Sequence, residues 1–246
     1  MQHSSIPMEF GNLRHLVILE FSNTNISGRI PASICNLKDL IGLTFPVNDL
    51  TGPLPACLFN LPMLHSLELA QNRLSGRLPL RAQGKNLSFV NLSKNQIGGR
   101  IPSWLFTLPA LEYLDMRFNK LEGPIENFKA PAARLLQSIY LNDNRITGFP
   151  SPLFQFTNLL VLYMDNNLLS GNIPLQLQPP PKLLFLNFAN NSLTGEIPST
   201  YCDLKFLTNL DLTSNKLSGT VPYCLRCMYE LNLKLEGNNF TGPTIC

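Results

Sequence analysis

The stretch "NRLSGRLP" (residues 72–79) decides the fold, because the chain repeats it with small changes. Close copies read "TNISGRIP", "NDLTGPLP", "NQIGGRIP", "NLLSGNIP", "NSLTGEIP" and "NKLSGTVP". Each copy continues the pattern L-x-x-L-x-L-x-x-N-x-L, so the full unit is 23 to 25 residues long. Self-similarity at a period of this length predicts a solenoid.

Ten copies align when they are counted from the first leucine of the pattern. They start at residues 16, 40, 64, 87, 111, 136, 159, 183, 207 and 230, and residues 1–15 form a partial copy. The ninth position is Asn in nine of the ten copies, and the thirteenth is Gly in all ten. We therefore treat residues 1–246 as one repeat domain that lacks an N-terminal cap. The opening "IPMEFGNL" resembles the end of a repeat, which predicts a fragment or a shortened gene product.

Each position of the unit has a physical reason. Leucines at the fourth and sixth positions alternate with polar residues, which is the period of a strand with one buried face. The Asn amide can satisfy backbone groups where the chain leaves the sheet, and can bond to the neighbouring copy. The Gly permits a backbone conformation that a Cβ would forbid. Because one unit cannot bury its own apolar face, we expect an α/β solenoid with a parallel sheet on its concave side and short helical or 3-10 turns on its convex side.

Several copies depart from the pattern and predict local irregularity. The copy at 111 contains "GPIENFKAPAAR", with Glu126 where Pro is expected, and the copy at 136 has a shortened "GFP". The segments "LRAQGKN" after Pro79 and "QLQPPPK" after Pro174 are poor helical turns. We expect the convex helices to be weakened at these places.

The unit resembles the plant-specific subclass of leucine-rich repeats, L-x-x-L-x-x-L-x-L-x-x-N-x-L-S/T-G-x-I-P, over residues 6–242. The chain is similar to ectodomain pieces of plant receptor-like proteins and receptor kinases, and to polygalacturonase-inhibiting proteins. The resemblance implies extracellular exposure, recognition of a protein or peptide ligand, and a second lateral strand formed by Gly-x-Ile-Pro. The cysteine-paired N-terminal cap of that family is absent from this sequence.

Six cysteines occur, four of them in a duplicated pattern: Cys35, Cys57, Cys202, Cys224, Cys227 and Cys246. Cys35 and Cys202 occupy position 20 of their copies, while Cys57 and Cys224 occupy position 18 of the next ones. Neighbouring copies stack about 4.8 Å apart, within the ~4.4–6.8 Å that a disulfide spans between Cα atoms. We therefore predict disulfides Cys35–Cys57 and Cys202–Cys224, with Cys227 and Cys246 left to close the C-terminal end. The duplicated spacing disfavours free thiols, and zinc would need a second cysteine pair at metal-site spacing.

Five Asn-x-Ser/Thr sequons are present, at Asn25, Asn86, Asn91, Asn190 and Asn239. Together with the cysteines they favour the secretory pathway and a cell-surface or extracellular site. The repeat consensus is itself rich in Asn, Ser and Thr, so some sequons arise without selection for glycans. Glycans on Asn91 or Asn190 would obstruct the concave side.

Composition and motifs exclude several classes of protein. The chain is 44% hydrophobic, as folded proteins are. Its net charge of +3, with only 14% charged residues, is too small for a general nucleic-acid binder. The apolar run "HLVILEF" is interrupted by Glu20, so it is neither a signal peptide nor a membrane span. Since His3, His15 and His65 stand in no catalytic or metal-ligand arrangement, we expect no enzyme activity, cofactor or metal site.

The concave face is expected to be acidic. Positions 2, 3, 5, 7 and 8 of each copy should face solvent there. The charged residues at these positions are Glu20, Glu68, Glu112, Asp115, Asp143, Asp165, Asp211 and Glu236 against Lys94, Arg117 and Lys234. The face then carries a net charge of −5, and the rest of the chain +8. Such a face favours a basic protein or peptide partner.

Aromatic residues gather on the middle copies of this face. The candidate partner-binding residues are Phe89, Tyr113, Asp115, Arg117, Phe118, Tyr140, Asp143, Tyr163, Asp165 and Phe185. Tyr140 and Tyr163 share position 5 of consecutive copies and are predicted to lie side by side. Exposed rings flanked by charges have the composition of binding hot spots. The alternative explanation is that aromatic residues have high strand propensity.

Basic residues follow a second, lateral line. Position 14 holds Arg29, Arg77 and Arg100, and position 10 holds Arg73, Lys120, Arg145 and Lys216. Such a stripe would suit a polyanion such as cell-wall pectin. A solvated face kept charged for solubility is the favoured interpretation.

Three functions are compatible with these features. The first is a recognition module that binds a protein or peptide on the concave face in plant defence or development signalling, with a co-receptor as a further partner. The second is a secreted inhibitor of a microbial wall-degrading polygalacturonase. The third is a structural protein that binds cell wall or ice along its flank. Regular threonine columns would support ice binding, and we identify none.

Overall fold

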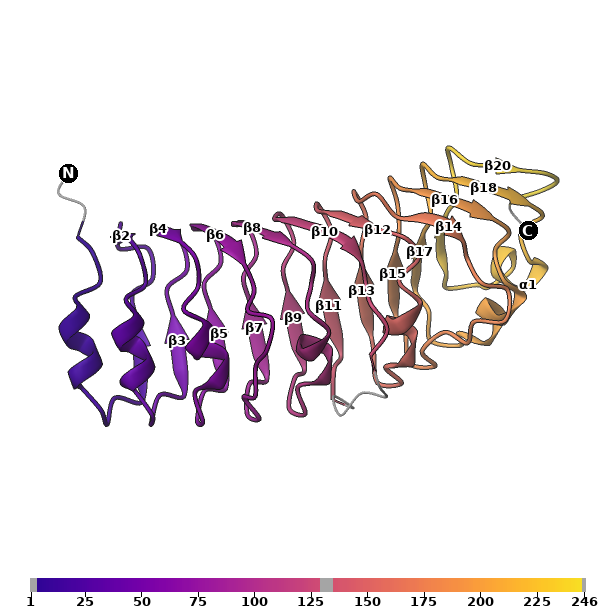
Figure 1. The fold of residues 1–246 in the computed structure, drawn as a ribbon. Helices are drawn as coiled ribbons and strands as arrows, with labels where there is room; N and C mark the ends of the chain where they lie inside the picture. Colours follow the sequence, from indigo (N-terminus) through magenta and orange to yellow (C-terminus); the bar gives the residue numbers. More distant parts are fainter. Residues whose placement is uncertain (1–3, 129–134, 245–246) are drawn as a thin grey trace.

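The computed structural model describes residues 4–128 and 135–244, which form an elongated solenoid (Figure 1). One parallel ten-stranded sheet runs along it, and its odd-numbered strands follow one another in chain order. These strands are β1 (Ile18–Glu20), β3 (Gly42–Thr44), β5 (Ser66–Glu68), β7 (Phe89–Asn91), β9 (Tyr113–Asp115), β11 (Ser138–Tyr140), β13 (Val161–Tyr163), β15 (Phe185–Asn187), β17 (Asn209–Asp211) and β19 (Asn232–Lys234). Each strand covers positions 3 to 5 of its copy, so the copies stack one strand apart, as the pattern predicts.

The sheet register follows the repeat register position by position. Leu114 pairs with Ile139, which pairs with Leu162, and all three side chains are fully buried. Residues on either side of this central position point to the opposite face, because successive side chains of a strand alternate. The core is therefore a continuous column of position-4 residues, and positions 3 and 5 form the concave face.

A second set of strands runs along the flank, on the upper edge of the solenoid in Figure 1. Six of them form one sheet: β2 (Ser27–Gly28), β4 (Asp49–Gly52), β6 (Arg73–Arg77), β8 (Gln96–Gly99), β10 (Lys120–Pro124) and β12 (Arg145–Thr147). Four more form another: β14 (Ser170–Asn172), β16 (Ser192–Gly195), β18 (Lys216–Gly219) and β20 (Asn239–Phe240). These strands precede the Gly-x-Ile-Pro segment for the most part, so its assignment as the lateral strand is corrected. Leu78 after β6 instead turns into the core, and the following Pro79 has no N–H to donate.

The lateral sheet is interrupted between β12 and β14, where only an isolated bridge joins Thr147 to Leu168. The cause is the shortened "GFP" of that copy. Phe149 folds inward and packs edge-on against Phe188, with 5.9 Å between ring centroids. The strand therefore ends at Thr147, which confirms the predicted irregularity of this copy.

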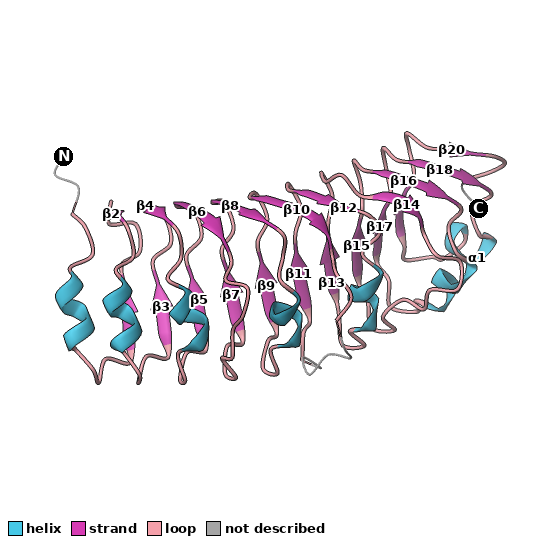
Figure 2. Ribbon diagram, in the orientation of Figure 1, coloured by secondary structure: helices cyan, strands magenta, loops and turns pink. Residues whose placement is uncertain are grey.

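Short helices cover the convex side and begin directly after the proline of their copy (Figure 2). The 3-10 helices are η1 (Met8–Asn12), η2 (Ala32–Asn36), η3 (Ala56–Asn60), η4 (Ser103–Thr107), η5 (Ser151–Gln155) and η6 (Ser199–Asp203), and α1 (Tyr223–Arg226) is a single α-helical turn. As predicted, residues 80–86 and 175–182 form no helix. The end of "GPIENFKAPAAR" lies outside the described residues.

The conserved geometry of the copies rests on the ninth-position Asn and the thirteenth-position Gly. Asn144 is buried, accepts a hydrogen bond from the N–H of Leu121 in the preceding copy (3.0 Å), and donates to the carbonyls of Met116 and Leu141 (3.0 and 3.1 Å). This confirms the predicted amide ladder. Gly99 has a φ of +77°, and a Cβ there would lie 2.9 Å from Cγ of Arg77.

Two of the predicted disulfides are present. Cys35 bonds to Cys57, with Cα atoms 5.8 Å apart, and Cys202 bonds to Cys224, with Cα atoms 5.7 Å apart. They link η2 to η3 and η6 to α1, that is, neighbouring turns of the convex side. The predicted pairing of Cys227 involves Cys246, which lies outside the described residues.

Candidate functional site

Four aromatic rings form a continuous row across the middle of the concave sheet. Phe89 stacks on Tyr113 with 4.6 Å between ring centroids and 6° between planes. Tyr113 then contacts Tyr140 at 5.6 Å, and Tyr140 meets Tyr163 edge-on at 5.5 Å and 84°. The predicted proximity of Tyr140 and Tyr163 is confirmed, and the strand register pairs them directly. We call these four residues the ring row.

Two further predicted aromatics lie near the ring row. Phe185 is half-buried on β15, and Phe118 is 45% exposed in the left-handed backbone region, with a φ of +53°. Among the described residues no ring contact joins either of them to the row. The contiguous aromatic surface is therefore the ring row itself.

Polar side chains at position 5 have a structural role that the sequence analysis missed. In five copies this side chain accepts a hydrogen bond from the backbone N–H of position 7, at 3.0 to 3.2 Å. The acceptors are Glu68, Asn91, Asp115, Asn187 and Asp211. Tyr140 and Tyr163 occupy the same position and have no such acceptor. Their copies therefore lack the hydrogen bond from the position-7 N–H and have an aromatic ring at position 5 instead.

Asp115 corrects the predicted set of solvent-facing residues, because its side chain is fully buried. Its Oδ1 accepts from the N–H of Arg117 (3.1 Å), and its Oδ2 lies 3.1 Å from Nε of Arg117. Burial raises the pKa of Asp115, and the neighbouring guanidinium opposes that rise. The hydroxyl of Tyr113 donates to the same carboxylate at 3.4 Å. Asp115 therefore lies beneath the surface and holds Arg117, whose guanidinium lies 5.3 Å from the ring centre of Tyr140.

Position 7 was predicted to face solvent, but four of its ten side chains are buried. Ala70, Ser93, Asn142 and Ala189 are buried there. The chain turns away from the sheet at this position, so the side chain lies below those at positions 5 and 8. Of the two acids at this position, Asp165 is half-buried and Glu236 is exposed.

Acidic groups gather beyond the far end of the ring row. Burial, together with the nearby carboxylates of Asp143 and Asp211, raises the pKa of Asp165 to about 6. Burial also raises the pKa of Tyr163, as do Asp165 and Asp211. Asp143 and Asp165 are half-buried in adjacent copies, and the N–H of Asp143 donates to the carbonyl of Asp165 (3.0 Å).

A polar hollow of about 100 Å³ continues the concave surface toward the C-terminus. Its lining residues include Tyr163, Asn187, Asn209, Asp211, Asn232 and Lys234. Asp211 and Lys234 face each other across β17 and β19 with 3.6 Å between Oδ2 and Nζ. The three asparagines were not predicted as site residues. Their occurrence at positions 3 and 5 of successive copies is the signal that would have identified them.

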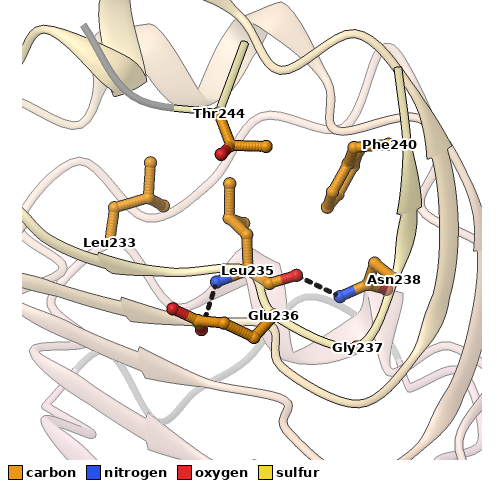
Figure 3. Close-up of a pocket in the computed structure, with 7 residues that line it drawn as sticks. All are labelled: Leu233, Leu235, Glu236, Gly237, Asn238, Phe240 and Thr244. Carbon is orange, nitrogen blue, oxygen red and sulfur yellow. Dashed lines mark hydrogen bonds between the residues drawn. The ribbon is translucent and has the colours of Figure 1, made fainter. Parts of the chain in front are cut away.

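Another hollow, of about 240 Å³, lies at the C-terminal end of the described chain (Figure 3). Leu233, Leu235 and Phe240 point into it, and Asn238 donates to the carbonyl of Leu235 at its edge (2.9 Å). The two leucines and the phenylalanine hold core positions of the last copy. This hollow is thus the open end of the core rather than part of the concave surface.

The lateral basic residues lie on the flank, but acids interrupt the stripe. Arg73 pairs with Asp49 (2.9 Å), and Arg100 pairs with Glu126 (2.8 Å). Lys120 donates to the side-chain oxygen of Gln96 (3.2 Å). The stems of Arg29, Arg77 and Arg100 lie over Gly52, Gly99 and Gly123 of the following copies. Arg145 and Lys216 are exposed at the starts of β12 and β18.

The sequons lie on several surfaces. Asn25 and Asn239 are exposed near the flank, and Asn86 donates to the carbonyl of Pro62 (2.7 Å). Asn91 lies on β7 of the concave sheet, and Asn190 is exposed at position 8 of its copy. Both concave sequons lie outside the ring row.

Comparison with known proteins adds to this geometry. Five segments match the Leucine Rich Repeat family: residues 15–37, 86–108, 135–156, 182–204 and 206–228. The fold is a leucine-rich repeat solenoid. None of the curated proteins compared with the sequence matches it significantly.

Several solved structures resemble this solenoid. A plant peptide hormone receptor, RGFR1 in complex with RGF2, is 34% identical with a TM-score of 0.90, and the match covers 97% of this chain and 38% of that one. A plant ice-binding protein is 28% identical with a TM-score of 0.81, covering 99% of this chain and 79% of that one. The Arabidopsis receptor kinase HAESA, in complex with the peptide hormone IDA and the co-receptor SERK1, is 27% identical with a TM-score of 0.73, covering 96% and 48%. The chain thus spans less than half the length of either receptor chain.

The described residues contain neither a candidate membrane-spanning helix nor a candidate metal site. No helix there has the length and apolar character to cross a membrane. Within the same residues, no three His, Cys, Asp or Glu side chains converge as metal ligands would.

Proposed function

We propose that this solenoid is an extracellular recognition module that binds a protein or an extended peptide on its concave face, in plant defence or development signalling. The observation that carries the proposal is the ring row. Four rings in mutual contact cross four successive strands, and two of them replace the acceptor that stabilises the turn in other copies. Strand propensity alone does not account for rings at a position where the fold gains a hydrogen bond from Asp or Asn.

The electrostatics of the face indicate a basic ligand. Asp143, Asp165 and Asp211 lie next to the far end of the ring row, and the half-buried setting strengthens their effect on a charged group. An acidic, aromatic surface of this kind suits a cationic segment of an otherwise apolar peptide. The similarity to two receptors solved with peptide hormones supports the same class of ligand.

The proposal is tested by ligand capture with a matched pair of variants. The disulfide-intact protein and its Tyr140→Ala/Tyr163→Ala variant are used to capture peptides and proteins from plant apoplastic fluid and fungal culture medium. The control is Ile18→Ala, which removes an exposed side chain from β1 of the same sheet. We expect a peptide, or a receptor ectodomain, that is lost with the double variant and kept with the control.

Other captures would change the assignment. A basic fungal polygalacturonase held through the ring row would establish the inhibitor function instead. Ligands that are retained equally by the wild type and the double variant would contradict recognition by the concave face.

Ice binding is a second candidate function, and one lateral feature favours it. Position 12 of the repeat holds Ser or Thr in eight of the ten copies, a mixed column rather than a regular threonine column. These residues are Ser27, Thr51, Ser75, Thr147, Ser170, Thr194, Ser218 and Thr241, and none of them is buried. The similarity to a plant ice-binding protein points the same way. Charged residues such as Arg73 and Lys216 at position 10 flank the column and weaken the case for a flat neutral surface.

The test for ice binding is inhibition of ice recrystallisation. A Thr51→Lys/Thr194→Lys variant would lose the effect if the column binds ice, while Tyr140→Ala/Tyr163→Ala would keep it. Absence of inhibition by the wild-type protein would remove this candidate.

The lateral basic stripe is tested by chromatography on pectate. Retention of the protein that falls with added salt would support binding of a polyanion by the stripe.

A further inference from the structure

The cations of the concave face that form ion pairs lie away from Asp143 and Asp165. Arg117 lies over Tyr140 and beside Asp115, and Lys234 faces Asp211. Among the described residues, by contrast, neither Asp143 nor Asp165 has a basic partner within 4 Å, and no cation lies over Tyr163. Two carboxylates and a ring thus lie together without a balancing positive charge.

A buried amide beside these groups also lacks a partner. Asn142 is only 8% exposed, and its Nδ2 donates to Oδ2 of Asp143 at 2.7 Å. Its Oδ1 is buried and has no hydrogen-bond partner among the described residues. The same holds for Oδ1 of Asp165. Buried acceptors are normally satisfied, so both point to a donor that the described chain does not supply.

We propose that Asn142, Asp143, Asp165 and Tyr163 form a seat for the guanidinium group of an arginine in the ligand. The inference rests on the proposed function and names the chemistry of its main contact. Guanidinium offers five N–H donors in one plane and stacks on aromatic rings. Carboxylate oxygens on two adjacent copies and the amide oxygen of Asn142 accept such donors, while the ring of Tyr163 takes the planar face.

The chain itself shows that the surface accommodates this group. Arg117 already places a guanidinium 5.3 Å from the centre of the Tyr140 ring, with a buried carboxylate behind it. The proposed seat likewise places carboxylates beside a tyrosine ring, although Asp143 and Asp165 are half-buried and hold positions 8 and 7 of their copies. An ammonium group has no planar face to stack and fewer donors in fixed directions, so lysine should bind more weakly.

The seat is tested by 19F NMR on protein labelled with 3-fluorotyrosine. Signals of Tyr140 and Tyr163 are assigned with single Phe variants, and the buried Tyr201 reports on the fold. The probes are the N-acetyl methylamides of arginine, lysine and citrulline, the last being a neutral isostere of arginine. We expect the Tyr163 signal to shift saturably with arginine, and at least tenfold higher citrulline or lysine to be needed for the same shift.

Variants link the shift to the named residues. Asp143→Asn/Asp165→Asn should weaken the arginine response at least tenfold while leaving the Tyr201 signal unchanged. Glu20→Gln/Glu112→Gln removes two exposed carboxylates elsewhere on the face and should leave the response intact. An equal response to citrulline or lysine, or a response indifferent to Asp143 and Asp165, would overturn the seat.

The result of the NMR experiment can be distinguished from the result of the ligand capture. A captured ligand that depends on the ring row, together with no arginine response, would eliminate the seat and leave the proposed function standing. An arginine response in a protein whose captured ligands ignore the ring row would support the seat and contradict the recognition proposal.

Discussion

The side-chain amide of the ninth-position asparagine joins neighbouring copies through several hydrogen bonds. Asn144 satisfies one N–H and three carbonyls, two of these groups belonging to the preceding copy. Each such residue joins two copies and fixes the turn that follows the strand. Removing the side chain leaves several buried polar groups without a partner, which costs more than the hydrogen bonds alone contribute.

We expect Asn144→Ala to lower the free energy of unfolding by about 3 kcal/mol, the cost of a few unsatisfied buried groups. The measurement is urea unfolding followed by circular dichroism. Asn36→Ala, at an exposed site with no side-chain bond to the stack, should change it by less than about 0.5 kcal/mol. Equal effects of the two substitutions would contradict the ladder.

The raised pKa of Asp165 predicts that stability and ligand affinity change in opposite directions with pH. Burial raises its pKa from 3.8 to about 6, so the native state binds more protons than the unfolded chain between these values. Its contribution to stability therefore falls as pH rises from about 4 to about 6. Asp165→Asn should flatten this part of the stability profile and raise stability above pH 6. Affinity for a cationic ligand should instead fall as pH is lowered through about 6, because the carboxylate becomes neutral.

Thermal unfolding measured at several pH values, for wild type and variant, checks the first part. Glu112→Gln is the control because that carboxylate is exposed on the same face. If stability of the wild type rose with pH over the whole interval and Asp165→Asn followed it, the assigned burial effect would be wrong.

At the scale of elements, the disulfides tie the convex turns in pairs near the two ends of the solenoid. Cys35–Cys57 joins η2 to η3, and Cys202–Cys224 joins η6 to α1. Hydrogen bonds link the concave strands continuously, whereas the convex helices are separate short turns. The disulfides therefore hold the side of the stack that has fewer regular backbone links.

Replacing Cys202 and Cys224 with Ser should destabilise the C-terminal copies by about 3 kcal/mol, from the loop-closure entropy of a 22-residue separation. Hydrogen exchange followed by mass spectrometry should show lost protection in residues 199–226 and little change in residues 32–60. The matching Cys35→Ser/Cys57→Ser variant should show the reverse. Uniform loss of protection in both variants would mean that the copies unfold as one unit.

The repeat pattern was enough to place the strands, the amide ladder, two disulfides and the weak convex turns. These features depend on residues at fixed spacings and on contacts with the next copy. They can therefore be predicted from the spacing of residues in the sequence. The ring row followed in part from the shared position of Tyr140 and Tyr163. The burial of Asp115 and the inward turn of Phe149 did not, because each depends on how a particular side chain competes with its neighbours for the space below the surface.

At the scale of the whole molecule, the stack is quasi-one-dimensional, and the position of a defect should matter as much as its size. Leu162 is fully buried on β13, an interior strand of the concave sheet, while Leu235 lies at the C-terminal end of the described core. Leu162 holds position 4 of its copy and Leu235 holds position 6, and both side chains belong to the core. A defect in the centre interrupts the stack on both sides, whereas a defect at the end affects only the last copies.

Leu162→Ala should cost about 2–5 kcal/mol and lower hydrogen-exchange protection in the copies on both sides. Leu235→Ala should lower protection only near residues 207–240. Hydrogen exchange resolved by peptide provides the comparison. Loss of protection throughout the chain in the Leu235 variant would show that the solenoid behaves as a single cooperative block.

The interruption of the lateral sheet falls between the two copies that carry Tyr140 and Tyr163. On the concave side those copies are joined by a full three-residue ladder, but on the flank by one bridge from Thr147 to Leu168. These two copies are therefore joined more firmly through the concave sheet than through the flank. We expect bending of the solenoid between these copies to occur on the flank, and the spacing of Tyr140 and Tyr163 to change little.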